Sequence, residues 1–335
     1  MLSRVADNLY WLARYLERAE NLARLVDVNA SLMLDLPREL SPGWLPVITI
    51  AGSDALFAER SPDDASERAV VRFVVADAKN PGSMLASLAT AREIARTIRD
   101  ILPREVWEHI NELHMYVAER AAEAIGKQTR YAFLNRVVLG TQTFTGMLEG
   151  IVNEGAAQSF MALGRNIERA DMTSRIVDVR AVGMIPVSGN ALRPFANIQW
   201  MSLLRSLSGY HMYRLKMRER VHPNGVVRFL LADEDFPRAC VCCLQRMEVV
   251  LEDLPNSEHL LRRVARVRRA LTGALSTKLT GEELHGFIDR LQLALARIND
   301  ELARTYFLGE LTLTRKTQSQ SQSQSQTLSA TGSAK

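Results

Sequence analysis

The sequence predicts an all-α protein, a helical bundle made of two diverged repeats related by a pseudo-two-fold axis. Two observations lead to this prediction. Apolar residues recur every three or four positions through most of the chain, and two long motifs occur twice in the same order. With 335 residues, of which 47% are hydrophobic and 24% charged, the chain can bury a large core.

Each predicted helix follows from its apolar stripe. The first stripe runs from Leu12 to Val26 at spacings of three and four. Comparable stripes predict helices over 82–101, 104–124, 131–153, 156–180, 236–251, 258–275 and 280–308. The β-branched run at 70–75 is predicted to be a buried helix rather than a strand, because Arg68, Arg72 and an Ala-rich flank accompany it. Clusters of Pro and Gly separate the helices.

Two blocks of sequence that each occur twice indicate the repeats. Residues 14–28 and 165–179 lie 151 positions apart and are identical at eight of fifteen positions, where chance would give about one match. The block V-V-R-F-V-V-A-D-x-x-x-P at 70–81 returns 156 positions later, at 226–237, with Leu-Leu in place of the second Val-Val. Copies of this length are structural units rather than short solenoid repeats, and such units commonly pack about a pseudo-two-fold axis.

These spacings predict the domain organisation. The first helical repeat covers residues 1–152 and the second covers 153–311. Residues 312–335 are predicted to be a disordered tail, because their Ser/Gln-rich sequence offers almost nothing to bury. Trp44 and Trp200 also lie 156 positions apart, and large aromatic residues at matching places are expected in the core of both repeats.

Charge and composition exclude several classes. The net charge is +4 and both signs are mixed along the chain, so a nucleic-acid partner is not expected. No apolar run is long enough to cross a bilayer, and Arg4 and Asp7 interrupt the N-terminus where a signal peptide would be apolar. The sequence therefore predicts a cytoplasmic protein without a membrane partner. The cysteines at 240, 242 and 243 fit neither a disulfide framework nor a zinc site and are expected to be buried.

Two motifs resemble a known family. The N-terminal L-S-R-V-A-x-N-L-Y-W-x-x-R-Y-x-E-R-A-E-N-x-A-R-L and the later L-G-R-x-x-E-R-A-D-M-T-S-R resemble the signatures of the alpha-E superfamily, a bacterial group of all-helical proteins. The resemblance covers residues 1–310, with Ala13 where the family has a Gly; Gly164 is its match in the second motif. It implies partners: a circularly permuted ATP-grasp ligase, a transglutaminase-like protein and a peptide substrate. It identifies no catalytic residue.

The paired motif is the candidate site. At about 100° per residue, each copy aligns a carboxylate and two guanidiniums along one narrow stripe of an otherwise apolar helix. The stripes contain Arg14, Glu17 and Arg24 in the first copy and Arg165, Glu168 and Arg175 in the second. Arg72 and Arg228, which lie beside Phe73 and Phe229 in the second block, are candidates to join the same cluster.

Two interpretations of the cluster remain open. It is either a set of ion pairs that fixes how the repeats dock, or a site between them that holds a carboxylate- or phosphate-bearing group through Arg. The function predicted is a helical, non-nucleotide-binding component of an ATP-dependent peptide or amide ligase system, which binds the ligase or its peptide substrate through this cluster. One alternative is a stand-alone enzyme that uses Glu17 or Glu168 as acid/base. The other is a structural oligomeric scaffold.

No cofactor or metal site is predicted. Glu282 and His285 have the spacing of a di-iron motif, but the second Glu-x-x-His that such a site needs is missing. His109 and His114 lie five positions apart and do not share a helix face, so they are not expected to act as a ligand pair. No Gly-rich phosphate loop or nucleophile elbow occurs in the chain.

Overall fold

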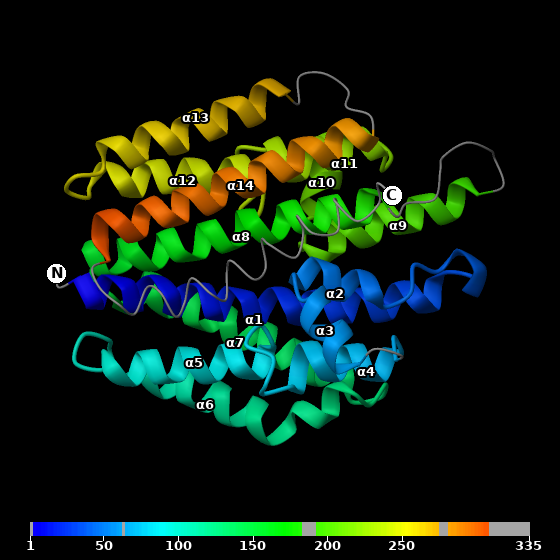
Figure 1. Ribbon diagram of the computed structural model, residues 1–335, viewed down its shortest axis with the longest axis horizontal. Helices are drawn as coiled ribbons and strands as arrows, with labels where there is room; N and C mark the ends of the chain where they lie inside the picture. The colour runs from blue at the N-terminus through cyan, green and yellow to red at the C-terminus, as the bar shows by residue number, and fades with distance from the viewer. Residues whose placement is uncertain (1–2, 62–63, 183–191, 275–280, 308–335) are drawn as a thin grey trace.

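The structure, a computed structural model, describes residues 3–61, 64–182, 192–274 and 281–307 (Figure 1). Within these ranges all regular elements are helical, with fourteen α-helices and three short 3₁₀ or π turns. The all-α fold is therefore confirmed. The run at 70–75 is also helical, because α4 (Glu67–Val71) continues into the π turn η2 (Arg72–Ala76).

Two long helices form the centre of the molecule (Figure 1). They are α1 (Ser3–Asp35) and α8 (Ala156–Val182). They run in the same direction, because Tyr10 meets Gly164 near their beginnings and Asn29 accepts a hydrogen bond from Arg180 near their ends. Both helices bury side chains on nearly every face, so the apolar stripes predicted from the sequence are only part of what they bury.

The backbones of α1 and α8 approach closely at Gly164. A Cβ atom at this position would lie 2.1 Å from the carbonyl oxygen of Tyr10. Only a glycine allows this contact, since the clashing atom belongs to the backbone and cannot rotate away. The glycine of the second motif therefore has a packing role.

Two layers of helices enclose the central pair on opposite sides (Figure 1). On one side, α1 packs against α5 (Met84–Thr97) and α7 (Arg130–Ile151), and α6 (Arg104–Arg120) packs on both. On the other, α8 packs against α12 (Cys240–Glu252) and α14 (Gly281–Tyr306), and α13 (Glu258–Ala274) packs on both. The core is continuous from one layer to the other through α1 and α8.

Shorter helices gather toward one end of the bundle. The first group is η1 (Arg38–Leu40), α2 (Leu45–Ala51), α3 (Asp54–Arg60), α4, η2 and, after α6, η3 (Ala121–Ala124). The second is α9 (Arg193–Ser206), α10 (Tyr210–Met217) and α11 (Pro223–Ala232). α2 packs against both α1 and α8, and α9 does the same, so each group contacts both central helices.

Local sequence explains several boundaries. The Ser83 hydroxyl accepts a hydrogen bond from the Ala86 amide and caps α5, and the His222 imidazole accepts one from the Gly225 amide and caps α11. The aromatic residues expected in the core are buried there: Trp44, Trp200, Phe73 and Phe229. The three cysteines are buried too, and burial raises the pKa of the Cys243 thiol to about 12.

Some of the sequence-based predictions lie outside the described residues. The predicted disordered tail at 312–335 is one of them. The boundary between the predicted repeats at residues 152 and 153 falls between α7 and α8 and stays a prediction. None of the helices in the described ranges combines the length and hydropathy needed to cross a membrane.

Candidate functional site

The Glu-Arg dipeptides of the two motifs face each other across the α1–α8 interface. Glu17 of α1 pairs with Arg169 of α8, with Oε2 at 2.9 Å from Nε. Arg18 of α1 pairs with Glu168 of α8, with Nε at 2.7 Å from Oε1. Each dipeptide thus supplies one carboxylate and one guanidinium to the opposite helix.

Glu168 lies between two guanidiniums. Besides Arg18, it accepts a hydrogen bond from Nε of Arg14 on Oε2 at 2.7 Å. Burial by itself would raise the pKa of this carboxyl, but attraction and hydrogen bonds from Arg18 and Arg14 outweigh it and hold the pKa at about 2. Glu168 is therefore ionised at neutral pH although its residue is only 2% exposed.

Glu17 is held in a similar way, with a different second partner. Nη1 of Arg238 donates to Oε1 of Glu17 at 2.7 Å and to Oδ1 of Asn21 at 2.6 Å, and Nη2 donates to Glu20 at 2.6 Å. Burial opposes ionisation of Glu17, but Arg169 and Arg238 lower its pKa below the ordinary value. Arg238 lies just before α12, so this pair also fixes the α12 layer to α1.

Arg14 extends the network to α14. Its Nη1 donates to Oδ1 of Asn299 at 2.8 Å, and the Tyr10 hydroxyl donates to the same oxygen at 2.7 Å. The Arg14 guanidinium also lies 4.8 Å from the ring centroid of Trp11. Burial raises the pKa of Tyr10 to about 12, so this hydroxyl remains a donor at neutral pH. The network, defined here as the interface cluster, therefore joins α1, α8, α12 and α14.

The other predicted site residues lie in different surroundings. Arg24 pairs with Glu20 and Arg175 pairs with Asp171, each on its own helix, so neither flanks Glu17 or Glu168 as expected. An arginine four residues from a carboxylate reaches it along the same helix face, which explains the difference. Arg165 lies 3.9 Å from Glu149. Burial, and then repulsion from Arg169, lowers its pKa.

The expectation that Arg72 and Arg228 join the cluster is wrong. Both side chains are exposed, and within the described residues neither forms an ion pair with the cluster. The adjacent Phe73 and Phe229 are the residues that point into the core. In a helix, neighbouring side chains diverge by about 100°, so a buried Phe places the preceding Arg toward solvent.

Three arginines of the cluster were not predicted from the sequence. Arg18 and Arg169 recur with the same 151-residue spacing as the glutamates beside them, and this signal was sufficient to identify them. They lie outside the narrow stripe, but long arginine side chains reach across the interface to the facing carboxylate. Arg238 had no such signal, because it lies outside both repeated motifs and is positioned by the fold, where its carbonyl accepts a hydrogen bond from Thr173.

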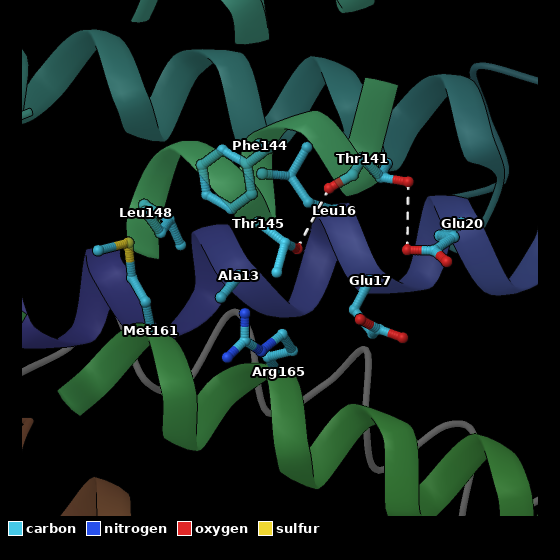
Figure 2. A pocket seen from close by; sticks show the side chains of 10 residues that line it. All are labelled: Ala13, Leu16, Glu17, Glu20, Thr141, Phe144, Thr145, Leu148, Met161 and Arg165. Atoms are coloured by element: carbon cyan, nitrogen blue, oxygen red, sulfur yellow. Dashed lines mark hydrogen bonds between the residues drawn. The ribbon is translucent and has the colours of Figure 1, made fainter. Parts of the chain in front are cut away.

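The space beside the cluster is small. A cavity of about 10 Å³ lies between α1, α7 and α8, lined mainly by apolar side chains together with Glu17, Glu20, Thr141 and Arg165 (Figure 2). The Thr141 hydroxyl donates to Glu20 at 3.2 Å across this space. A volume of this size holds about one water molecule, so a peptide or nucleotide does not fit beside Glu17 without movement of the helices.

Arg180 is a buried cation near the end of α8. Its Nη2 donates to Oδ1 of Asn29 at 2.7 Å. Within the described residues of the chain, its Nε and Nη1 have no hydrogen-bond partner. Burial lowers the pKa of this guanidinium to about 10.

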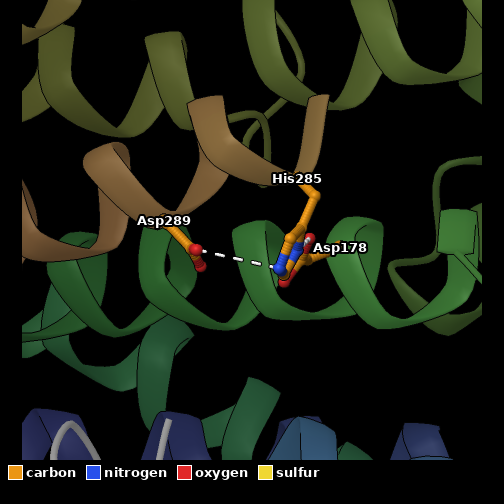
Figure 3. A group of neighbouring side chains, drawn as sticks. All are labelled: Asp178, His285 and Asp289. Atoms are coloured by element: carbon orange, nitrogen blue, oxygen red, sulfur yellow. Dashed lines mark hydrogen bonds and ion pairs between the residues drawn. The ribbon is translucent and has the colours of Figure 1, made fainter. Parts of the chain in front are cut away.

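A second polar group links α8 to α14. Nδ1 of His285 lies 2.7 Å from Asp178 and Nε2 lies 3.7 Å from Asp289 (Figure 3). Oxygen and nitrogen atoms of these residues lie within 4.8 Å of one another, a spacing within reach of a divalent cation. However, the two ring nitrogens face different carboxylates, which is the arrangement of an ion-pair bridge. The hydrogen bond to Asp178 raises the pKa of His285. The absence of a metal or cofactor stays a prediction.

The fold and interface cluster define a class: all-helical proteins whose two central helices are joined by buried Glu-Arg pairs. The chain belongs to the Alpha-E family, described as a predicted alpha-helical domain with a conserved ER motif, which matches residues 1–307. Several Glu-Arg dipeptides occur in the sequence, among them the two that form the reciprocal pairs. No solved structure matches the chain.

Curated relatives are similar over most of this chain. Uncharacterized proteins of Mycobacterium bovis and of two strains of Mycobacterium tuberculosis are each 24% identical to it over 278 residues. The matched region covers 76% of this chain but only 30% of each relative. In these relatives, the region similar to this chain is therefore part of a considerably longer polypeptide.

Proposed function

We propose that this chain is the helical component of an ATP-dependent peptide or amide ligase system. In this role it binds a circularly permuted ATP-grasp ligase or the ligase's peptide substrate and leaves nucleotide chemistry to that partner. A transglutaminase-like protein is a second expected partner. The observation that carries the proposal is the length of the relatives, in which a similar region is joined to further chain. In one protein a helical unit can be covalently linked to the domain it works with, and in a different protein the same unit can bind that domain as a separate chain.

The interface cluster supports the docking interpretation better than the binding interpretation. Its carboxylates are 2–4% exposed and each has two guanidinium partners. A ligand would have to displace these pairs and push apart the helices α1 and α8, whose backbones touch at Gly164. We therefore propose that the cluster holds the two halves together, and that the ligase or peptide binds to another surface.

The stand-alone enzyme is the weaker candidate. A general base works best when its pKa lies near the operating pH, whereas Glu168 has a pKa of about 2. Glu17 and Glu168 also lie beside separate cavities, each with room for about one water molecule. Acid/base catalysis by Glu17 or Glu168 would need an opened state in which the arginines are withdrawn.

We also propose that the fold arose by duplication, with a pseudo-two-fold axis along the central pair. The order α1, α5, α6, α7 matches the order α8, α12, α13, α14, and the outer helices pack on the central ones in the same way. The reciprocal Glu-Arg pairs support this proposal, as does the exchange in which α2 packs on α8 and α9 on α1. Arg238 departs from the proposed symmetry. It lies just before α12, whereas no arginine lies just before the matching helix α5.

The proposed role is tested by capture and by nucleotide binding. The tagged chain, expressed in its native bacterium, is cross-linked and purified, and bound proteins are identified by mass spectrometry. We expect an ATP-grasp ligase among them and no ATP binding or hydrolysis by the isolated chain. ATP turnover by the isolated chain, or repeated capture without any ATP-dependent ligase, would contradict the proposal.

A further inference from the structure

An open hollow of about 520 Å³ lies at the end of the bundle, away from the interface cluster. Asn197 and Met201 of α9 and Tyr210 and Arg214 of α10 form one side of it (their helices are labelled in Figure 1). The connection between α10 and α11, residues 218–221, forms the other. This volume is within the range of pockets that bind small molecules, whereas the cavities beside Glu17 and Glu168 hold only about 10 Å³ each.

The hollow is strongly basic. Arg214, Arg218 and Arg220 line it, and Glu219 is the acidic residue among the lining side chains. Glu219 is directed to His222, with Oε2 at 3.4 Å from Nε2. Within the described residues none of the three guanidiniums forms an ion pair, whereas the arginines that face Glu17 and Glu168 are all paired. Three cations that share one hollow repel one another and favour an anionic ligand.

The backbone places one of these arginines at a conformational cost. Arg218 ends α10 in the left-handed region, with φ of 53°, and its amide donates to the carbonyl of Arg214. Helices that end this way usually have Gly at this position, because a side chain there costs about 1 kcal/mol. The arginine therefore gives the hollow a charge at a position where glycine would give a more stable helix end.

One side of the hollow suits a ligand with an apolar group. Tyr210 and Met201 are half-buried there. The guanidinium of Arg205 lies 5.3 Å from the centroid of the Tyr210 ring, which fixes the ring against α9. A bound molecule can thus contact an aromatic surface while its charged groups reach the arginines that line the same hollow.

We propose that this hollow binds a small ligand that carries two or more oxyanion groups, either carboxylates or phosphates. Arginine binds both groups through paired N–H donors. The three arginines of the hollow can therefore hold two or more such groups at once. The proposal does not depend on the ligase role, because it concerns binding by the chain alone. A peptide with acidic side chains and a diphosphate are the two sources of this chemistry.

The experiment is isothermal titration calorimetry on the full chain with inorganic pyrophosphate and, separately, with a tri-glutamate peptide. We expect binding of at least one of them, weakened by added salt as the charged contacts are screened. Arg218→Gly and Arg214→Ala should each raise Kd about ten-fold or more, which is the contribution of a charge-assisted hydrogen bond. Arg218→Gly should leave the melting temperature unchanged or higher, because it relieves the left-handed residue.

Two control variants show whether binding weakens when any exposed arginine is removed, or when any left-handed residue is relieved, outside the hollow. Arg266→Ala removes an exposed arginine from α13, and Asn256→Gly relieves another exposed left-handed residue, with φ of 59°, outside the hollow. Neither should change Kd. Tighter binding of pyrophosphate identifies phosphate as the preferred group, and tighter binding of tri-glutamate identifies carboxylates. The proposal is overturned if neither ligand binds at millimolar concentration, or if the controls weaken binding as much as the Arg214 and Arg218 variants.

Discussion

At the scale of single residues, the central question is why charged side chains lie inside this bundle. Glu168 and Glu17 each form ion pairs with two guanidiniums, so the Coulomb attraction of both partners compensates for the loss of hydration. Such a pair stabilises only as a unit. Removing one member leaves the others buried without a counter-charge, and this makes the cluster testable by substitution.

We expect Glu168→Gln to lower the free energy of unfolding by about 3–5 kcal/mol, because Arg14 and Arg18 lose their shared carboxylate. The matched control is Glu108→Gln, which removes an exposed carboxylate paired with Arg104 on the same helix. It should cost less than about 0.5 kcal/mol. Urea denaturation followed by circular dichroism measures both. Equal effects of the two substitutions would mean that the cluster does not hold the helices together.

The surroundings of Arg14 change the expected effect of its substitution. The binding interpretation predicts that Arg14→Ala costs little stability, since clustered arginines in an open cleft repel one another. In the structure, Arg14 is 7% exposed and bonded to Glu168 and Asn299. We therefore expect Arg14→Ala to destabilise the fold by an amount comparable to Glu168→Gln.

Acid should destabilise the protein through the same carboxylates. The pKa of Glu168 is about 2 in the folded chain against an ordinary value of 4.5, so its ionised form favours folding at every pH above about 4.5. This contribution, about 3 kcal/mol, is lost as the pH falls from 4.5 toward 2. Thermal melts across this range should show a steep decline for the native chain. A decline of the same size in Glu168→Gln would show that other groups cause it.

At the scale of helices, the parallel contact of α1 and α8 depends on a glycine at one crossing. Gly164→Ala places a methyl group 2.1 Å from the Tyr10 carbonyl oxygen, so the helices must move apart and disturb the ion pairs beyond it. We expect a loss of about 1–3 kcal/mol or more. Ala13→Gly, at the matching position of α1, should cost about 1 kcal/mol, from helix propensity alone.

Melting curves of the two variants measure this difference. Ala13 faces the small cavity shared by α1, α7 and α8, so no tight backbone contact depends on it. A Gly164→Ala variant as stable as the native chain would show that the close approach of α1 and α8 is not required for the fold.

At the scale of the whole molecule, each central helix packs against elements of both predicted repeats. α1 buries side chains toward α8 and α9 as well as toward its own layer, and α8 contacts α2 in return. A fragment of residues 1–152 or 153–311 would expose the apolar face that the other covers. We expect neither fragment to fold cooperatively alone and expect the two to refold when mixed. Circular dichroism and size-exclusion chromatography test this, and a cooperative melt of either fragment alone would contradict it.

The sequence by itself determined the helical class and the family of this protein. Periodic apolar residues predict helices regardless of their partners, because the 3.6-residue turn is a local property of the backbone. The same reasoning found Glu17, Glu168 and Arg14, whose motif recurs at a fixed spacing. Arg18 and Arg169 could have been predicted in the same way, because they recur at the same spacing.

Only the tertiary structure decided which charges meet. Glu17 could have paired along its own helix, but parallel packing brought Arg169 to it, and the turn before α12 brought Arg238 from 221 positions away. Arg214, Arg218 and Arg220 likewise share one hollow through the packing of α9 and α10 and the turn that follows. Contacts between distant segments depend on the whole set of packed helices, and no single motif of the sequence contains that information.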